Sequence, residues 1–470
     1  MARLTPRRRI WTAVGLLASI TALTVGAWGL REWAPLAHEH APVTWPRNVQ
    51  PVVDFVQSEA HLQFTDAVTV RFVPSRADFN ALLASTPRTE AATARLAADA
   101  ALGRALGFWA GDVDLGAWAD TTRNATSLAS AYLLASNTVI VAAKDADAAL
   151  TPMQRADLVV TLTEVLDNQH YPINARLRVA ATSQQADVIT GISIGEGVWM
   201  HDRYVHRFNT ADRTAYDSAT AKRSAVFNAA TTKVSSVYRA IRVLPQRLGV
   251  GFVAALHSQQ PDRFARAVTS DLPTALDQME MPSAKYTRRD TTDTIHPPAV
   301  PVNAQLVGHR QLGPFGLYLM LANGLPVTEA LTASDGWGND AVTIYRSGTT
   351  TCADGRVLAD TSADADRIER GLNAWGHARP REAAALVGRK GKTLLYTVCD
   401  PGPTVHQTVV GADALDQFFG RVEELIQRID SDGQPTRSEC IAVSAYAKYV
   451  ARDLNVAVLD RITADCDSSI

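Results

Sequence analysis

Hydrophobic and polar positions follow a helical period over residues 151–171, where one side of the predicted helix is apolar and the other is mostly polar. The apolar positions recur at i, i+1, i+4, i+7 and i+8 and are Leu158, Val159, Leu162, Val165 and Leu166. Thr151 followed by Pro152 is a typical helix start, because a hydroxyl caps the free amides and proline suits the first turn. We therefore predict a helix over residues 151–171, with Val160, Thr161, Glu164 and Asn168 on its other side.

The same patterns predict elements on both sides of this helix. Before it, they predict a strand at 67–73, an alanine-rich helix at 88–109, and a hairpin at 131–143 that turns at Ser136 and Asn137. After it, residues 186–234 have mostly helical periodicity, and the polar, proline-rich residues 287–305 indicate a boundary. Beyond the boundary we predict helices at 316–325, 364–375, 413–429 and 440–454, and strands at 341–346, 356–361 and 392–398.

The central helix resembles the active-site helix of a bacterial family of membrane-anchored, zinc-metallopeptidase-like proteins, which reads roughly H-E-L-x-H-A-L-Q-D-Q-H-F-D-L. Residues 165–173 follow the second half of that pattern closely. In the first half, the two metal-binding histidines fall on Val160 and Glu164, and the catalytic glutamate falls on Thr161. Two histidines at i and i+4 hold one zinc ion, and the glutamate polarises the water bound to it. The resemblance therefore implies a relative that has lost this chemistry.

Other segments resemble the same family in the same order. Gly195-Glu196-Gly197 resembles the helix that carries the third zinc ligand, which falls on Glu196. The remaining similar segments are 245–253, 273–286 and 336–340, so the resemblance covers roughly residues 85–375. A second interpretation makes Glu196 a structural residue at the start of its helix, paired with Arg203 or Arg207.

The sequence also leaves open a rebuilt metal site. Its ligands would come from Glu164, Glu196, His170 and His201, although the spacing of Glu196 and His201 does not place them on one helix face. His170 has a structural interpretation, because a histidine at the end of a helix can bind the last carbonyl groups. We predict that no metal is bound, and zinc is the expected cofactor only if the site is rebuilt.

The amino terminus has the pattern of a membrane anchor. Arg7, Arg8 and Arg9 precede residues 10–30, which contain no charged side chain and are long enough to cross a bilayer. The competing interpretation is a cleaved signal peptide, but its apolar region would be longer than usual. We predict a cytoplasmic tail at 1–9, a transmembrane helix at 10–30 and a linker at 31–46.

Charge and cysteine content restrict the class of protein. The chain has 46 Lys and Arg against 48 Asp and Glu, so no basic surplus indicates nucleic-acid binding. Four cysteines in an exported protein indicate two disulfides, and three pairings are possible. We predict the two local pairs, Cys352–Cys399 and Cys440–Cys466.

Together these features predict an α+β fold, a mainly helical metallopeptidase-like ectodomain with a small antiparallel sheet, preceded by one transmembrane helix. The degenerate peptidase domain would span residues 47–290, and an α+β subdomain would span 300–470. The predicted function is that of a catalytically inactive binding or scaffolding protein of the cell envelope, with a peptide or an envelope protein as partner. The alternatives are an active metal-dependent hydrolase and an accessory subunit of a membrane complex.

Overall fold

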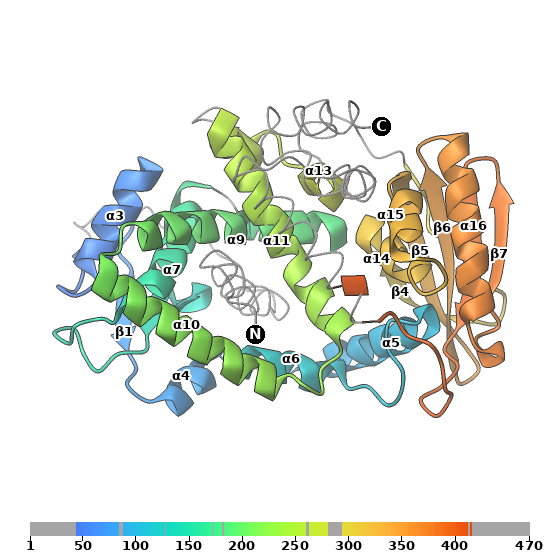
Figure 1. Ribbon diagram of the computed structural model, residues 1–470, viewed down its shortest axis with the longest axis horizontal. Helices are drawn as coiled ribbons and strands as arrows, with labels where there is room; N and C mark the ends of the chain where they lie inside the picture. Colours follow the sequence, from blue (N-terminus) through green and yellow to red (C-terminus); the bar gives the residue numbers. More distant parts are fainter. Residues whose placement is uncertain are drawn as a thin grey trace.

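The computed structural model describes residues 44–83, 88–126, 128–171, 173–180, 183–259, 263–280, 294–411 and 414–415. In Figure 1 the helices α3, α7, α9 and α10 lie on one side of the molecule, and a sheet with α14, α15 and α16 lies on the other. Helix α5 runs along the lower edge toward the sheet. The described chain is therefore built from a helical half and a half that is organised around a sheet.

The helical half contains most of the helices and three short strands. Its helices are α3 (Gln50–Ala60), α4 (Arg76–Leu83), α5 (Glu90–Leu106), α6 (Leu115–Ala125), α7 (Pro152–His170), α8 (Ile173–Val179), α9 (Ser183–His206), α10 (Thr210–Ala230), α11 (Ser236–Gln259), α12 (Arg263–Thr269) and α13 (Leu276–Glu280). Its strands are β1 (Thr69–Phe72), β2 (Ser130–Leu133) and β3 (Thr138–Val141), with the short 3-10 helix η1 (Leu134–Ser136) between the last two.

The predicted helix at 151–171 is confirmed as α7. Thr151 is its N-cap, and the Thr151 hydroxyl accepts a hydrogen bond from the backbone N–H of Gln154 while the Gln154 side chain accepts one from the N–H of Thr151. This reciprocal pair is a capping box, which satisfies two backbone donors that the helix leaves free. The apolar side of α7 is fully buried in a core shared with α3, β1 and β3.

The predicted hairpin at 131–143 is also confirmed, because β2 pairs antiparallel with β3. Asn137 in the connection has a φ of 47°, the left-handed region that asparagine tolerates better than most residues. Strand β1 lies on the other side of β3 and runs parallel to it, so the sheet order is β1-β3-β2. A parallel pair needs a long crossover, and α4, α5 and α6 provide it between β1 and β2.

The second half contains a five-stranded antiparallel sheet in the order β4-β5-β6-β8-β7. Its strands are β4 (Gln305–Arg310), β5 (Trp337–Ser347), β6 (Thr350–Ala359), β7 (Leu386–Lys390) and β8 (Thr393–Cys399). Its helices are α14 (Gly313–Leu321), α15 (Val327–Ser334), α16 (Ser362–Ala378) and the 3-10 helix η3 (Arg381–Ala383). One continuous apolar core joins residues of α5 and α11 to residues of α14, α16 and this sheet.

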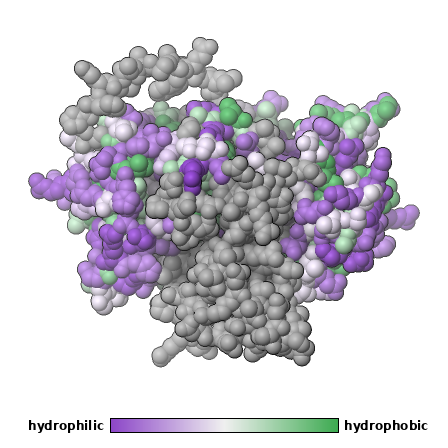
Figure 2. Space-filling view, turned by 90° about the horizontal axis from the view of Figure 1, so that it is seen from above, coloured by the Kyte–Doolittle hydropathy of each residue, from purple (hydrophilic) through white to green (hydrophobic). Residues whose placement is uncertain are grey.

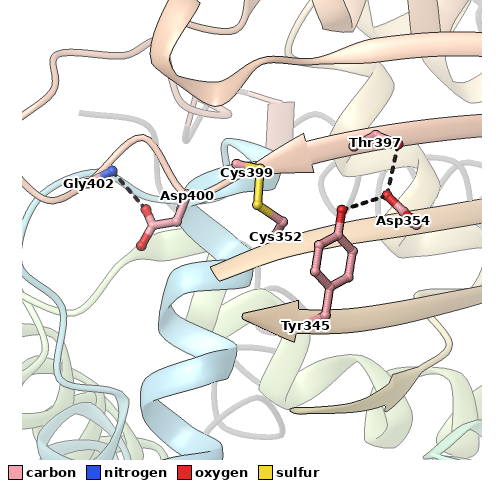
Figure 3. The surroundings of a disulfide bond; sticks show 7 residues. All are labelled: Tyr345, Cys352, Asp354, Thr397, Cys399, Asp400 and Gly402. Atoms are coloured by element: carbon pink, nitrogen blue, oxygen red, sulfur yellow. Dashed lines mark hydrogen bonds between the residues drawn. A yellow bond between two sulfur atoms is a disulfide. The ribbon is translucent and has the colours of Figure 1, made fainter. Parts of the chain in front are cut away.

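The predicted disulfide between Cys352 and Cys399 is present (Figure 3). The two cysteines face each other on β6 and β8, with their Cα atoms 3.9 Å apart. Beside the bond, the Asp354 carboxylate accepts hydrogen bonds from the Tyr345 hydroxyl (3.1 Å) and the Thr397 hydroxyl (2.8 Å). Three neighbouring strands are therefore joined by side chains as well as by their backbones.

The structure has the helices and sheets of an α+β fold, but the predicted form of that fold is wrong. The chain does not have one small antiparallel sheet, because the sheet beside α7 is mixed and a larger antiparallel sheet lies in the other half. Among the described residues, no helix has the length and apolar character needed to cross a membrane. The predicted segments 1–9 and 10–30, most of the linker, most of the last two helices and the pair Cys440–Cys466 lie outside the described residues.

Candidate functional site

The helix positions that would carry zinc chemistry are used for packing in this structure. The Thr161 hydroxyl shares a hydrogen bond of 2.8 Å with the hydroxyl of Ser130 on β2, and both residues are buried. Val160 faces α9 so closely that a Cβ atom at Gly197 would lie 2.9 Å from the Val160 Cγ1 atom. The catalytic-glutamate position therefore connects α7 to the sheet, and the first histidine position packs against a glycine of α9.

Glu196 lies within α9 rather than near its start, so the interpretation of Glu196 as a residue at the helix amino terminus is wrong. Its buried carboxylate accepts a hydrogen bond of 2.8 Å from the Nε2–H of His257 on α11. Arg203 and Arg207, the candidate partners of Glu196, both bind Glu59 instead. Glu196 is therefore held by a residue that is 61 positions away in the sequence.

The His257 ring is fixed by aromatic neighbours on both sides. It stacks on Trp199 with ring centroids 3.9 Å apart and an angle of 9° between the planes, and on Phe264 at 5.5 Å and 12°. Arg203 lies over the Trp199 ring at 4.9 Å. The imidazole is therefore held in one orientation by its hydrogen bond to Glu196 and by this stack.

Glu164 and Asp167 lie one turn apart on α7, close to Glu196. The half-buried Glu164 carboxyl group has no hydrogen bond or ion pair with another described residue, and the buried Oδ2 atom of Asp167 has no hydrogen-bond partner among them. Burial raises the pKa of Glu164 to about 8. Burial, and then the charges of Glu196 and Glu164, raise the pKa of Asp167 well above its ordinary value. Three carboxyl groups thus share one region with a single imidazole.

Two tyrosines border this carboxyl cluster, which we define as Glu164, Asp167 and Glu196. Burial and the charge of Glu164 raise the pKa of Tyr132 on β2 to about 12. Burial and the charges of Asp167 and Glu196 raise the pKa of Tyr171, at the end of α7, to about 12. Both tyrosines therefore stay neutral near pH 7.

The other two candidates for a rebuilt metal site lie apart from the carboxyl cluster. The His170 Nε2 atom is hydrogen-bonded to the backbone carbonyl of Gln63 (2.7 Å). The two ring nitrogens of His201 are bonded to the side chains of Asp202 (3.0 Å) and Tyr216 (3.1 Å). The structure therefore places Glu164 and Glu196 close to Asp167 but gives His170 and His201 other partners.

The residues present do not fit a zinc site. Val160 has no ligating atom, the Thr161 hydroxyl is bound to Ser130, and Glu196 is bound to His257. Within the part of the chain that the structure describes, no three His, Cys, Asp or Glu side chains are grouped so that they could hold a metal ion. A zinc centre needs three or four converging ligands, so we derive no chemistry through a metal here.

Sequence reasoning missed Asp167 and His257. Asp167 could have been found, because it lies three positions after Glu164 and therefore on the same helix face. His257 could not have been found in this way, because its contact with Glu196 joins two separate helices and leaves no periodic signal in the chain.

The unpartnered carboxyl of Glu164 gives a pH-dependent prediction. The unfolded chain loses this proton near pH 4.5 and the folded chain near pH 8, so the stability contributed by the neutral form is complete below pH 4.5 and lost as the pH rises through about 8. Between pH 6 and pH 8, we expect the free energy of unfolding of the wild type to fall by about 1 to 2 kcal/mol relative to that of Glu164→Gln. Urea unfolding of both proteins at each pH measures this difference.

The control for this prediction is Glu90→Gln, which removes the same charge from an exposed residue of α5. Its unfolding free energy is expected to follow that of the wild type across the same pH range. If Glu164→Gln also followed the wild type, the carboxyl of Glu164 would not be neutral in the folded protein.

The comparisons with known proteins concern the other half of the chain. Residues 302–414 match a family model described as "Domain of unknown function (DUF8575)". Neither a curated protein nor a solved structure matches the chain. The matched segment contains the whole five-stranded sheet with α14, α15 and α16, whereas the carboxyl cluster lies before it on α7 and α9.

Proposed function

We propose that this protein is a catalytically inactive relative of zinc metallopeptidases that acts outside the cytoplasm as a binding or scaffolding protein. The observation that carries the proposal is the hydrogen bond between Thr161 and Ser130. Through this hydrogen bond, the residue at the position of the catalytic glutamate joins α7 to β2. A hydroxyl bound in this way is no general base near neutral pH, because general bases need a pKa close to the working pH.

The contact between Val160 and Gly197 supports the same function. An imidazole at position 160 would have to share the space that the valine now fills against α9. The packing that replaced the metal ligands has kept α7 and α9 in close contact. A binding role requires such a rigid framework and does not require the metal.

The disulfide between Cys352 and Cys399 supports a location outside the cytoplasm. Disulfides form and persist in oxidising compartments and are rare where thiols are kept reduced. The surface is consistent with contact with water, because hydrophilic residues predominate over the described part of the face in Figure 2 and apolar residues are scattered.

Metal content tests the proposed function. The full-length protein is dialysed against zinc and then against buffer, and its metal is measured by elemental mass spectrometry. We expect less than about 0.1 zinc per chain for the wild type, because Val160 has no ligating atom and the Glu196 carboxylate is already bound to His257. One tightly held zinc per chain, together with metal-dependent cleavage of casein, would show that the protein is an active hydrolase.

A variant with the metal ligands restored tests the resemblance itself. Val160→His combined with Glu164→His places two imidazoles at i and i+4 on α7, and Glu196 is retained as the third ligand. We expect this double variant to hold about one zinc per chain under the same dialysis. Glu164→His alone is the matched control, since it supplies only one imidazole beside Glu196 and therefore lacks a third ligand. A double variant without zinc would contradict a peptidase-like arrangement of α7 and α9.

The second candidate function is hydrolysis at a rebuilt site. The contact that favours it is the one between His257 and Glu196, because a histidine oriented by a carboxylate can act as a general base. Loss of the casein-cleaving activity in His257→Gln would establish this function, and an inactive wild type would exclude it.

A further inference from the structure

We propose that the carboxyl cluster of α7 and α9 binds a primary ammonium group, supplied by a lysine side chain or by the amino terminus of a peptide. The inference rests on the proposed function, since it identifies the chemical class that the binding protein recognises. It goes further by stating which atoms make the contact and which charge the ligand must carry.

Among the described residues, the carboxyl cluster has few basic partners. Glu164, Asp167 and Glu196 supply three carboxyl groups, and His257 is the only basic side chain that is bound to any of them among the described residues. Glu164 and Asp167 are therefore bound to no basic side chain in the described part of the chain. Buried carboxylates in proteins are normally paired, because an uncompensated charge away from water is costly. Burial favours the neutral forms of Glu164 and Asp167, and a cationic group of a ligand would allow these carboxyl groups to ionise and pair with it.

One oxygen atom of Asp167 needs a hydrogen-bond donor, whatever the number of carboxyl groups around it. Asp167 is only 3% exposed, and its Oδ2 atom is buried without a hydrogen-bond partner in the described part of the chain. Buried acceptors nearly always receive a hydrogen bond. Asp167 lies close enough to Glu164 and Glu196 for their charges to act on it, so its free oxygen belongs to the same region. A ligand that donates a hydrogen bond there would satisfy this atom.

The aromatic residues around the cluster suit the same ligand. Tyr132 on β2 and Tyr171 at the end of α7 lie close enough to the cluster for its charges to act on their hydroxyl groups, and both residues are partly exposed. Aromatic rings attract cations over their faces and also pack against aliphatic chains. A lysine has a charged end and an aliphatic stem, so both parts would find partners.

The geometry favours an ammonium group over a metal ion or a guanidinium group. A metal ion needs several ligands that converge at about 2 Å, and no such group of three is present among the described residues. A guanidinium group is planar and favours two parallel bonds to one carboxylate. An ammonium group is compact and has three donors, so it can bind the Glu164 carboxyl group and the free Oδ2 atom of Asp167 through separate hydrogen bonds.

The test is isothermal titration calorimetry of the full-length protein with short capped peptides. Acetyl-Ala-Lys-Ala-amide carries only a side-chain ammonium group, and Ala-Ala-Ala-amide carries only an amino-terminal one. Acetyl-Ala-Ala-Ala-amide carries neither, and acetyl-Ala-Arg-Ala-amide carries a guanidinium group. We expect one of the first two to bind at least tenfold more tightly than the last two, and the preferred one identifies the source of the ammonium group.

Variants locate the binding site. Glu164→Gln and Asp167→Asn keep the size of each side chain, and each is expected to weaken binding of the preferred peptide at least tenfold. Glu90→Gln, which removes an exposed carboxylate of α5, is expected to leave binding within twofold. Circular dichroism of each variant confirms that it is folded, and Glu164→Gln serves if Asp167→Asn does not fold.

The calorimetry can overturn the inference without overturning the proposed function. Equal binding of all four peptides, tighter binding of the arginine peptide, or binding that is unchanged in Glu164→Gln would overturn the inference. None of these results would show a bound metal or proteolysis, so the inactive binding function would remain. Zinc binding and proteolysis by the wild type would instead overturn the proposed function.

Discussion

Replacing Gly249 by alanine is expected to destabilise the folded protein by about 3 kcal/mol. Gly249 lies on α11 where this helix crosses α9, and a Cβ atom there would lie 1.8 Å from the backbone oxygen of Gly191. Backbone atoms cannot rotate away as a side chain can, so the two helices would have to move apart. Chemical denaturation followed by circular dichroism measures the loss of stability.

Gly388→Ala is the matched control, because no atom lies within 4 Å of a Cβ atom at that position of β7 and its backbone is not left-handed. Its unfolding free energy is expected to change by less than about 0.5 kcal/mol. Equal effects of the two substitutions would mean that α9 and α11 are not in close contact. Moving α9 and α11 apart by Gly249→Ala would also affect the carboxyl cluster, since Glu196 is on α9 and His257 is on α11.

Replacing Arg223 by methionine is expected to cost about 3 to 5 kcal/mol of stability. The Arg223 guanidinium on α10 donates two hydrogen bonds to the Asp157 carboxylate on α7, at 2.9 and 2.6 Å. Asp157 is 2% exposed and also accepts a hydrogen bond from the backbone N–H of Ala129 (2.8 Å). Without the arginine, a buried carboxylate would lose the cation that balances it. Urea unfolding near pH 7 measures the effect.

A second substitution separates charge from packing. Asp157→Asn removes the charge but keeps an oxygen that can accept from Ala129, so the double variant with Arg223→Met is expected to be more stable than Arg223→Met alone. If the double variant were less stable by the sum of the two single effects, the two side chains would contribute independently, and the ion pair would not be the cause.

Local signals in the sequence were sufficient for the central helix and for the hairpin beside it. Thr151, Pro152 and Gln154 set the start of α7 through contacts within one turn. Asn137 allows the chain to reverse between β2 and β3. Both features depend on residues that are neighbours in the chain, so their patterns can be recognised without a structure.

Elements that depend on distant contacts could not be predicted in this way. Strand β1 pairs with β3 in parallel, and nothing within residues 69–72 indicates the direction of its partner. Strands β4 and β7 were missed because both are short edge strands that contain a glycine, Gly308 and Gly388. The contact of His257 with Glu196 likewise arises only when α9 and α11 pack together.

The disulfide in the five-stranded sheet restricts how copies of this chain can associate. Cys352 and Cys399 are 47 positions apart, and the closed loop between them contains α16 and β7. While the bond is intact, β8 cannot leave β6, so the hairpin of β7 and β8 cannot be exchanged with the same hairpin of a second molecule. The covalent bond therefore excludes domain swapping at this edge of the sheet, a route to dimers that edge hairpins otherwise offer.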